Sequence, residues 1–302
     1  MRIVAALGGN ALLKRGERPD SDIQEQNVEI AIAALAPLAR DHQLVITHGN
    51  GPQVGALALQ SASDPSLSRP FPLDALGAET QGLIGYWLVQ ELQNHLPDRI
   101  VTAIVTQTVV DRQDPAFGHP TKFVGPVYDE ADLRPIAAEH GWAIAPDGDR
   151  WRRVVASPKP VRIVETPVIR LLLDADAVVV CAGGGGIPVI EGPGGELSGV
   201  EAVIDKDLTT ALLAEQLNAD AFLVLTDVDG VFRDFGTPTA EQIASITAAD
   251  LRRVPFPAGS MGPKIDAVCR FAERTGGLAA IGSLADAAAI LDGRRGTSVL
   301  PG

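Results

Sequence analysis

Cysteine is scarce in this chain, which has only Cys181 and Cys269 among its 302 residues. Their separation does not match the close spacing of metal-ligand or redox pairs. We therefore expect both thiols to be reduced, as in a cytoplasmic protein.

Long apolar runs are missing as well. No uninterrupted apolar stretch is long enough to cross a bilayer. Residues 1–7 run straight into a strand pattern and are too short for a signal peptide. We therefore expect no membrane partner.

Several common enzyme signatures are absent. The Walker sequence needs Gly-Lys before Ser or Thr, and no Gly-Lys pair occurs. Gly183 and Gly185 are followed by Pro188, where a Rossmann fingerprint needs its third glycine. Neither Gly-x-Ser-x-Gly nor His-Glu-x-x-His is present. These absences argue against P-loop NTPases, Rossmann enzymes, α/β-hydrolases and zinc proteases of the His-Glu-x-x-His type.

Positive charge is in short supply. The net charge of −13 argues against nucleic acid as a partner, because phosphate backbones require clustered basic residues. An acidic protein that binds an anion must concentrate positive charge locally. Lysines that remain in an arginine-rich chain are candidates for that task, although codon usage explains any single one equally well. Of 25 basic residues, five are lysines: Lys14, Lys122, Lys159, Lys206 and Lys264.

Glycine, by contrast, is abundant and gathers at the ends of predicted strands. A strand, a glycine turn and a helix N-terminus together attract anions, because free N–H groups point at the turn. Ligands of parallel sheets bind at the carboxyl ends of strands, so we expect these turns to line one crevice. An ordinary strand-to-helix connection is the alternative for any single turn. The three stretches are Leu7-Gly8-Gly9-Asn10-Ala11, His48-Gly49-Asn50-Gly51-Pro52-Gln53-Val54-Gly55 and Cys181-Ala182-Gly183-Gly184-Gly185-Gly186-Ile187-Pro188-Val189.

Strand and helix patterns alternate along the chain, which predicts an α/β fold with a mainly parallel sheet and helices on both faces. Residues 111–159 have only short apolar pieces and are predicted to be an insertion with its own hairpins. A Gly/Pro-rich loop at 192–199 is the predicted boundary between two lobes that share one sheet. Strands are predicted at 2–7, 43–47, 100–110, 177–181, 221–225, 278–281 and 297–300. Helices are predicted at 22–40, 74–96, 205–217, 247–254, 261–274 and 284–291, after the second turn from 54, and in the second half of 161–174.

Five motifs occur in a fixed order and span nearly the whole chain. They are Gly-Gly-Asn-Ala at 8–11, His-Gly-Asn-Gly-Pro-Gln at 48–53, Cys-Ala-Gly-Gly-Gly-Gly-Ile-Pro at 181–188, Asp-Lys-Asp at 205–207 and Gly-Ser-Met-Gly-Pro-Lys at 259–264. Together they resemble the amino acid kinase family, and within it the carbamate kinases.

The resemblance implies an open three-layer αβα sandwich with a mainly parallel central sheet and a small protruding subdomain inserted at about 111–160. It implies that residues 1–195 form a lobe binding carbamate or carbamoyl phosphate, and that residues 196–302 form a nucleotide-binding lobe. It also implies a homodimer, for which the aromatic face of the predicted helix 74–96 is a candidate interface.

The implied reaction is reversible phosphoryl transfer between ATP and carbamate, giving ADP and carbamoyl phosphate. Such transfer depends on positioning and charge neutralisation. Carbamate is already an anion, so no general base is needed, and we expect His48 to orient its turn. Mg²⁺ is expected with the nucleotide, bound mainly by phosphates and water, so no protein metal ligands are predicted.

The resemblance also assigns roles to residues. Substrate-binding residues are Gly8, Gly9, Asn10, Gly49, Asn50, Gly51, Gly183 and Gly184. Nucleotide-binding residues are Lys206, Thr226, Asp227, Val228, Met261 and Lys264. Catalytic residues are Lys122, Lys206, Asp207 and Lys264. We expect phosphoryl oxygens to accept from the N–H groups of Gly8, Gly9 and Gly51, and Asp207 to hold the two ammonium groups by ion pairing.

Two positions depart from the wider family. That family has a third glycine where this chain has Asn50, and many members carry a lysine in the first strand, where this chain has Ala5 and Ala6. Our hypothesis is that Lys122, delivered by the protruding subdomain, supplies the missing charge. Asp205 is equally well explained as a helix cap.

Two other functions stay open from the sequence. One is a sibling kinase acting on another small carboxylate or phosphate, against which Asn50 and the insertion argue. The other is a non-catalytic sensor of nucleotide or carbamoyl phosphate, against which the retained lysines argue.

Overall fold

The computed structural model describes residues 1–14, 16–256 and 261–302. The largest sheet among them has eight strands, and its neighbouring strands are parallel except for one antiparallel pair, β16 and β17. Across the sheet the order is β15 (Ser245–Thr247), β17 (Thr297–Leu300), β16 (Leu278–Ser283), β12 (Ala221–Thr226), β1 (Arg2–Leu7), β2 (Gln43–His48), β9 (Val178–Val180) and β3 (Val101–Ala103). The predicted α/β class with a mainly parallel sheet is confirmed.

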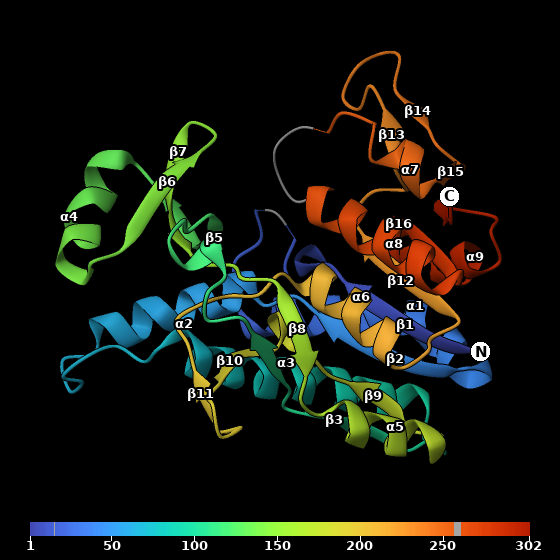
Figure 1. Cartoon of the computed structure of the whole chain (residues 1–302), viewed down its shortest axis with the longest axis horizontal. Helices are drawn as coiled ribbons and strands as arrows, with labels where there is room; N and C mark the ends of the chain where they lie inside the picture. Colours follow the sequence, from blue (N-terminus) through green and yellow to red (C-terminus); the bar gives the residue numbers. More distant parts are fainter. Residues whose placement is uncertain (15, 257–260) are drawn as a thin grey trace.

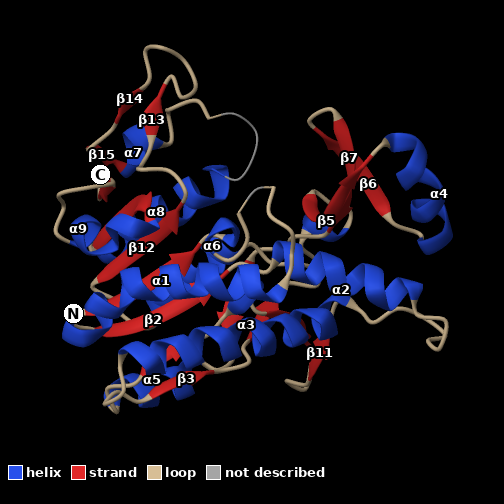
Figure 2. Cartoon of the chain, turned by 180° about the vertical axis from the view of Figure 1, so that it is seen from behind, coloured by secondary structure: helices blue, strands red, loops and turns tan. Residues whose placement is uncertain are grey.

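Helices cover both faces of this sheet. Side chains alternate along a strand, so Ile3, Ala5 and Leu7 of β1 join one core while Val4 and Ala6 join the other. The first core includes α1 (Ser21–Asp41), α3 (Leu73–His95) and α9 (Ala287–Leu291), and the second includes α5 (Thr166–Asp174), α6 (Lys206–Gln216) and α8 (Met261–Thr275). Figure 1 shows α6 and α8 over the near face, and Figure 2 shows α1 and α3 over the other. The three-layer sandwich expected from the resemblance is confirmed.

The single strand predicted at 100–110 is wrong. The chain leaves the main sheet after β3 and enters a second, four-stranded sheet as β4 (Gln107–Val110). Gln81 of α3 holds the crossing point, because its side chain accepts from Thr106 N at 2.8 Å and donates to Thr106 O at 3.1 Å. The apolar pattern continues across this break, so the sequence does not reveal it.

The second sheet also changes the prediction for residues 192–199. Its strand order is β11 (Leu197–Gly199), β10 (Ile187–Glu191), β4 and β8 (Pro160–Ile163). The predicted loop therefore ends in a short strand, which pairs antiparallel with β10. Helix α3 contacts β3 and β9 of the main sheet and β10 of the second sheet. The second sheet lies closer to the protruding part of the molecule (Figure 1).

The insertion stands away from the body in both views (Figures 1 and 2). The segment contains one hairpin, at residues 143–155, where hairpins were predicted, and also a helix that the sequence did not predict. Its elements are β5 (Lys122–Tyr128), α4 (Glu130–His140), β6 (Ala143–Asp147) and β7 (Arg150–Val155). It touches the body at α2 (Gly51–Ser63), where Gly125 packs so closely on Gly55 that a Cβ on Gly55 would overlap the Gly125 backbone. A second tether is the ion pair between Arg153 and Glu201, whose nitrogen and oxygen lie 3.1 Å apart.

The remaining elements are short. Helix α7 (Ala248–Leu251) is shorter than predicted, and the predicted helix at 284–291 consists of the turn η4 (Leu284–Asp286) followed by α9. Strands β13 (Phe232–Arg233) and β14 (Glu241–Gln242) form a small ribbon, and the other single-turn helices are η1 (Gly9–Ala11), η2 (Pro115–Phe117) and η3 (Gly183–Gly185). Among the described residues, no helix combines the length and the apolar character needed to cross a membrane.

Candidate active site

Three glycine turns meet where neighbouring parallel strands end. We name them the β1 turn (residues 8–11), the β2 turn (residues 48–51) and the β9 turn (residues 182–186). A Cβ on Gly49 would lie 3.0 Å from the Cα of Gly9, so the first two turns are in contact. A Cβ on Gly183 would overlap the ring of His48, which brings the third turn against the second. The three turns are therefore in contact at one end of the sheet, and a shared crevice there stays a prediction.

Gly184 shows why this packing requires glycine. Its φ of +64° is in the left-handed region, and a Cβ there would overlap the side-chain amide of Asn50. Asn50 is itself held in place, because its Nδ2 donates to Thr80 Oγ1 at 2.8 Å. Any side chain at 184 would therefore displace the β2 turn.

The backbone N–H groups of these turns divide into two kinds. Gly8 N donates to Leu225 O at 2.9 Å and Gly49 N donates to Leu7 O at 3.2 Å, so both extend the sheet. The expectation that Gly8 offers its N–H to a phosphoryl oxygen is therefore wrong. For Gly9 N and Gly51 N, no backbone acceptor is found within the described parts of the chain. Gly51 is the first residue of α2, so its N–H belongs to a helix N-terminus, where anions are favoured.

The β1 turn is also tied to the end of β12. Asn10 Nδ2 donates to Asp227 Oδ2 at 2.7 Å, and Thr226 Oγ1 donates to Asp227 Oδ1 at 3.0 Å. The first of these contacts joins residues 217 positions apart in the chain. It places the predicted nucleotide residues Thr226 and Asp227 beside the predicted substrate residue Asn10.

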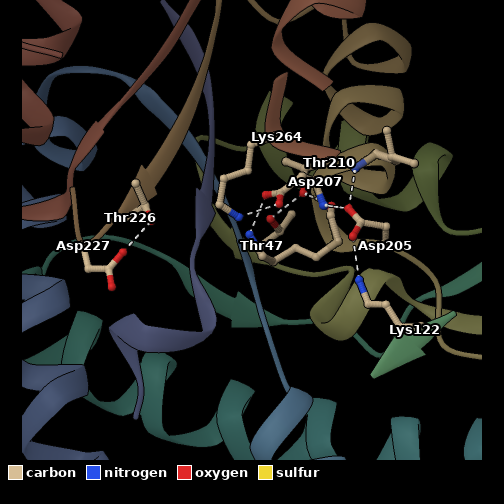
Figure 3. A network of polar contacts seen from close by, with 10 residues as sticks. Thr47, Lys122, Asp205, Asp207, Thr210, Thr226, Asp227 and Lys264 are labelled. Carbon is tan, nitrogen blue, oxygen red and sulfur yellow. Dashed lines mark hydrogen bonds and ion pairs between the residues drawn. The ribbon is translucent and has the colours of Figure 1, made fainter. Parts of the chain in front are cut away.

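Asp207 holds two ammonium groups. Its Oδ1 lies 2.6 Å from Lys206 Nζ, and its Oδ2 lies 2.9 Å from Lys264 Nζ (Figure 3). All three residues are buried, with Asp207 only 3% exposed. The ion pairing predicted for Asp207 is present, and it joins the first turn of α6 to the first turns of α8.

Burial and charge act in opposite directions on these groups. Burial alone would raise the pKa of the Asp207 carboxyl, but the charges of Lys206 and Lys264 outweigh it and hold this pKa well below its ordinary value. Burial lowers the pKa of the Lys206 ammonium, and the neighbouring Asp207 carboxylate only partly offsets that effect. The trio has two ammonium groups and one carboxylate, and burial strengthens the attraction between such charges and an anion.

The ammonium groups of Lys206 and Lys264 lie at the same end of the sheet as the glycine turns. Burial lowers the pKa of His48 to about 4, and the nearby charge of Lys206 contributes to that shift. Thr47, at the end of β2, has its Oγ1 2.7 Å from Thr210 Oγ1, and Thr210 in turn donates to Lys206 O at 2.7 Å. The end of strand β2, next to its turn, and the helix that carries Lys206 are thus joined directly.

His48 fits the orienting role expected from the sequence. Its pKa of about 4 keeps the ring neutral at pH 7, and its Nδ1 lies 3.0 Å from Gly49 O. The neutral ring donates this hydrogen bond within its own turn. The opposite edge of the ring packs on Gly183.

Lys122 reaches the same region from the protruding subdomain. Its Nζ lies 2.5 Å from Asp205 Oδ2 (Figure 3). Asp205 is also the N-cap of α6, since its Oδ1 accepts from Asp207 N at 2.9 Å and from Leu208 N at 3.3 Å. The cap predicted for Asp205 is confirmed, and this residue has a second partner that the sequence did not indicate.

Two parts of the predicted site are less well connected. Val228 follows Asp227 and is half-buried, and Met261 packs against the core that contains α8. Gly259 and Ser260 of the last motif lie outside the described residues. The glycine turns contact one another, and Asp207 pairs with both Lys206 and Lys264.

The sequence analysis did not identify the residues that hold the glycine turns in position. Thr106 Oγ1 accepts from Ala182 N at 3.0 Å, while Gln81 binds the Thr106 backbone and lies against Gly183. Thr47 and Thr210 form the link described above. Thr47 adjoins a motif, which was a usable signal, whereas Gln81 lies in a helix with no distinguishing pattern.

A resident metal site is not expected from these side chains. Among the residues that the structure describes, no group of three or more His, Cys, Asp or Glu side chains is placed to hold a metal ion. Asp207 is already neutralised by two lysines. A divalent ion that arrives on nucleotide phosphates needs no such cage, so the donor set fits that mode of binding.

Glycine turns at the carboxyl ends of parallel strands, a helix N-terminus and buried lysines define an α/β protein built to hold phosphorylated anions. The model described as the amino acid kinase family matches residues 1–282. The chain is 54% identical over 303 residues to a carbamate kinase of Rhizobium meliloti, covering 99% of this chain and 93% of that relative. It is 50% identical over 300 residues to a carbamate kinase of Haemophilus influenzae, covering 99% and 96%.

A solved structure agrees with these relatives. The carbamate kinase from Giardia lamblia bound to AMP-PNP superposes with a TM-score of 0.91 at 39% identity, covering 100% of this chain and 98% of that one. The chain therefore belongs to the amino acid kinase family, and within that family to the carbamate kinases. The resemblance found in the five motifs is confirmed.

Replacing Asp207 with Asn tests the buried ion pairs. The variant leaves two buried ammonium groups without their counter-charge, which we expect to lower the free energy of unfolding by about 3–5 kcal/mol at neutral pH. The pKa of folded Asp207 is below its ordinary value of 3.8, so its stabilisation is complete above that value and is lost as the pH falls toward the folded pKa. The difference between the proteins should therefore shrink in acid.

Urea unfolding of both proteins between about pH 7 and about pH 3 measures this effect. A difference that keeps its full size at the acid end contradicts the pairing.

Proposed function

We propose that the protein catalyses reversible phosphoryl transfer between ATP and carbamate, in which ADP and carbamoyl phosphate yield ATP and carbamate. The observation that carries this proposal is the pair of buried ammonium groups that Asp207 holds beside the glycine turns. The carbamate kinase relatives, which match along the whole chain, support the choice of substrate.

The chemistry requires no group beyond those already described. Phosphoryl transfer passes through a loose transition state with negative charge on the transferring oxygens, so catalysis consists of alignment and charge stabilisation. We assign Lys206 and Lys264 to the phosphoryl oxygens of the nucleotide and of the group in flight. The N–H groups of Gly9 and Gly51 would hold the acceptor side in line.

Proton transfer need not involve the protein. Carbamate is an anion and attacks without a general base. This agrees with a buried, neutral His48 whose Nδ1 is already engaged with Gly49 O. The proposed step is therefore a direct in-line displacement with no covalent intermediate.

The proposed contacts follow the geometry of the crevice. For carbamate or carbamoyl phosphate they are Gly8, Gly9, Asn10, Gly49, Asn50, Gly51, Gly183 and Gly184, with Gly8 serving through its lack of a side chain. For the nucleotide they are Lys206, Thr226, Asp227, Val228, Met261 and Lys264. Lys122 is proposed to act from the protruding subdomain, which lies about residues 111–160.

We propose Mg²⁺ as the metal that accompanies ATP or ADP. When bound, it neutralises charge on the phosphate oxygens and orients them.

We also propose that residues 1–195 bind the carbamoyl substrate and residues 196–302 the nucleotide. The glycine turns belong to the first range and the paired lysines to the second.

We also propose where the protein is located and how it assembles. Cys181 and Cys269 are both free and buried, which favours a reducing compartment such as the cytoplasm.

A homodimer is proposed through α3 and the adjacent edge strand β3. Large apolar side chains are exposed there at Leu83, Tyr86, Ile100 and Val105.

Light scattering tests the dimer, for which we expect about twice the monomer mass of 31.6 kDa. Tyr86→Asp and Leu83→Asp together place charge in the proposed interface and should shift the mass to that of the monomer. A wild-type protein with the monomer mass overturns this part of the proposal.

A coupled assay for ATP made from ADP and carbamoyl phosphate tests the reaction itself. We expect turnover by the wild type, and a loss of about 100-fold or more in kcat for Lys206→Ala and for Lys264→Ala. Lys159→Ala is the matched control, because Lys159 is exposed and its side chain lies outside the network, and it should keep wild-type turnover.

The same assay separates the alternatives. Turnover with another acyl phosphate but none with carbamoyl phosphate assigns the protein to a sibling kinase. Tight nucleotide binding with no transfer to any acceptor assigns it to a sensor. Either result overturns the proposed reaction.

A further inference from the structure

Charges of opposite sign alternate across the N-terminus of α6. In spatial order the groups are Lys122, Asp205, Lys206, Asp207 and Lys264, of which residues 205–207 are consecutive. Asp207 holds two of the three ammonium groups, and Asp205 holds the third (Figure 3). Each carboxylate thus has a lysine partner, and the two residues are linked because Asp207 N donates to Asp205 Oδ1.

The two oxygens of Asp205 have separate partners. Oδ1 faces the helix and accepts from the N–H groups of Asp207 and Leu208. Oδ2 faces outward and accepts from Lys122 Nζ at 2.5 Å. The Asp205 side chain is only 14% exposed, so its contact with Lys122 is shielded from solvent more than an ordinary surface ion pair is.

The contact links the protruding subdomain to the helix that carries Lys206. Lys122 is the first residue of β5 in the protruding subdomain, and Asp205 directly precedes Lys206. A lysine side chain is long and flexible, and its ammonium group adopts many positions unless a partner restrains it. Asp205 supplies that restraint at the end of the helix that carries the site lysine.

We propose that Asp205 is a positioning residue that places the Lys122 ammonium at the catalytic crevice. This inference rests on the proposed function, because it concerns the same phosphoryl transfer. An ammonium group has three N–H donors, of which Asp205 occupies one. Within the described residues no partner is found for the other two, which can donate to an oxyanion that enters between the subdomain and the N-terminus of α6.

Contacts other than the ion pair of Lys122 with Asp205 also attach the subdomain to the body. Loss of that ion pair should therefore act on Lys122 and not on the whole subdomain. Arg153 Nη2 lies 3.1 Å from Glu201 Oε1, and Glu201 Oε2 accepts from Leu73 N at 2.8 Å. Gly125 packs on Gly55. Loss of the Asp205 contact should therefore release Lys122 without detaching the subdomain.

Asp205→Asn separates the two tasks of this side chain. Asn caps helices about as well as Asp, so thermal stability should stay close to that of the wild type. The amide cannot both cap the helix and accept from Lys122, since only one of its two groups is an acceptor. We expect kcat/KM for carbamoyl phosphate to fall about 10- to 100-fold, with the KM for ADP unchanged within about twofold. If Asp205→Asn does not fold, Asp205→Ser retains the cap and also lacks the acceptor for Lys122.

A double-mutant cycle with Lys122→Ala decides whether Asp205 acts through Lys122. The double variant should be no slower than Lys122→Ala alone, because the second change removes the support of a group already lost. Losses that multiply in the double variant overturn the proposal. An unchanged kcat/KM in Asp205→Asn overturns it as well.

Glu201→Gln is the matched control. It breaks the ion pair of Arg153 with Glu201, which also joins the subdomain to the body, and leaves Lys122 with Asp205. We expect its kcat/KM to stay within about threefold of the wild type. A fall equal to that of Asp205→Asn would mean that a loosened subdomain explains both, and would overturn a specific role for Asp205.

Reductive methylation followed by mass spectrometry tests the restraint without any turnover. Lys122 should react several-fold faster in Asp205→Asn than in the wild type, about threefold or more, measured against Lys159 in the same sample. Equal rates overturn the proposal even if the enzyme is active. A wild type that makes no ATP refutes the proposed function, whereas the methylation rates still decide whether Asp205 holds Lys122.

Discussion

The structure depends on one buried carboxylate that is shared by two ammonium groups. Asp207 lies in the first turn of α6 and binds Lys206 beside it and Lys264 on α8. Burying a charge costs free energy unless an opposite charge lies beside it. Each of these three groups can therefore be buried only where its partners are present. The carboxylate neutralises only one of the two positive charges. Under the proposed function, the excess charge is what attracts a phosphate.

The rest of the fold brings backbone donors to that charge. Parallel pairing of β1, β2 and β9 ends three strands at one edge, where glycine turns pack against one another without side chains between them. The β12 strand ends beside them, through the contact of Asn10 with Asp227. Helix α6 is joined to strand β2, next to the β2 turn, through Thr47 and Thr210. An acidic chain of net charge −13 therefore has a confined positive region where the turns meet.

The features that could be predicted from the sequence are those that a short stretch of the chain determines. Glycine runs after apolar strands, the cap at Asp205 and the layered α/β order are each encoded within a few neighbouring residues, and the structure contains them. Contacts between distant residues carry no such signal. The pairing of Lys122 with Asp205 spans 83 positions, and Gln81 bonds Thr106 across 25 positions from the middle of a helix. The break between β3 and β4 was missed for the same reason, since it is set by Gln81 and not by the apolar pattern around it. Gly8 was misjudged because strand pairing with Leu225, another distant contact, uses its N–H group.

A crystal structure with a non-hydrolysable ATP analogue is the most direct test of the central claim. The account predicts that phosphate oxygens lie within about 3 Å of the Nζ atoms of both Lys206 and Lys264, with the N–H groups of Gly9 and Gly51 facing the terminal phosphate. Asp207 should remain bonded to both lysines in that complex. Phosphates bound elsewhere, with the two ammonium groups contacting only Asp207, would contradict the account.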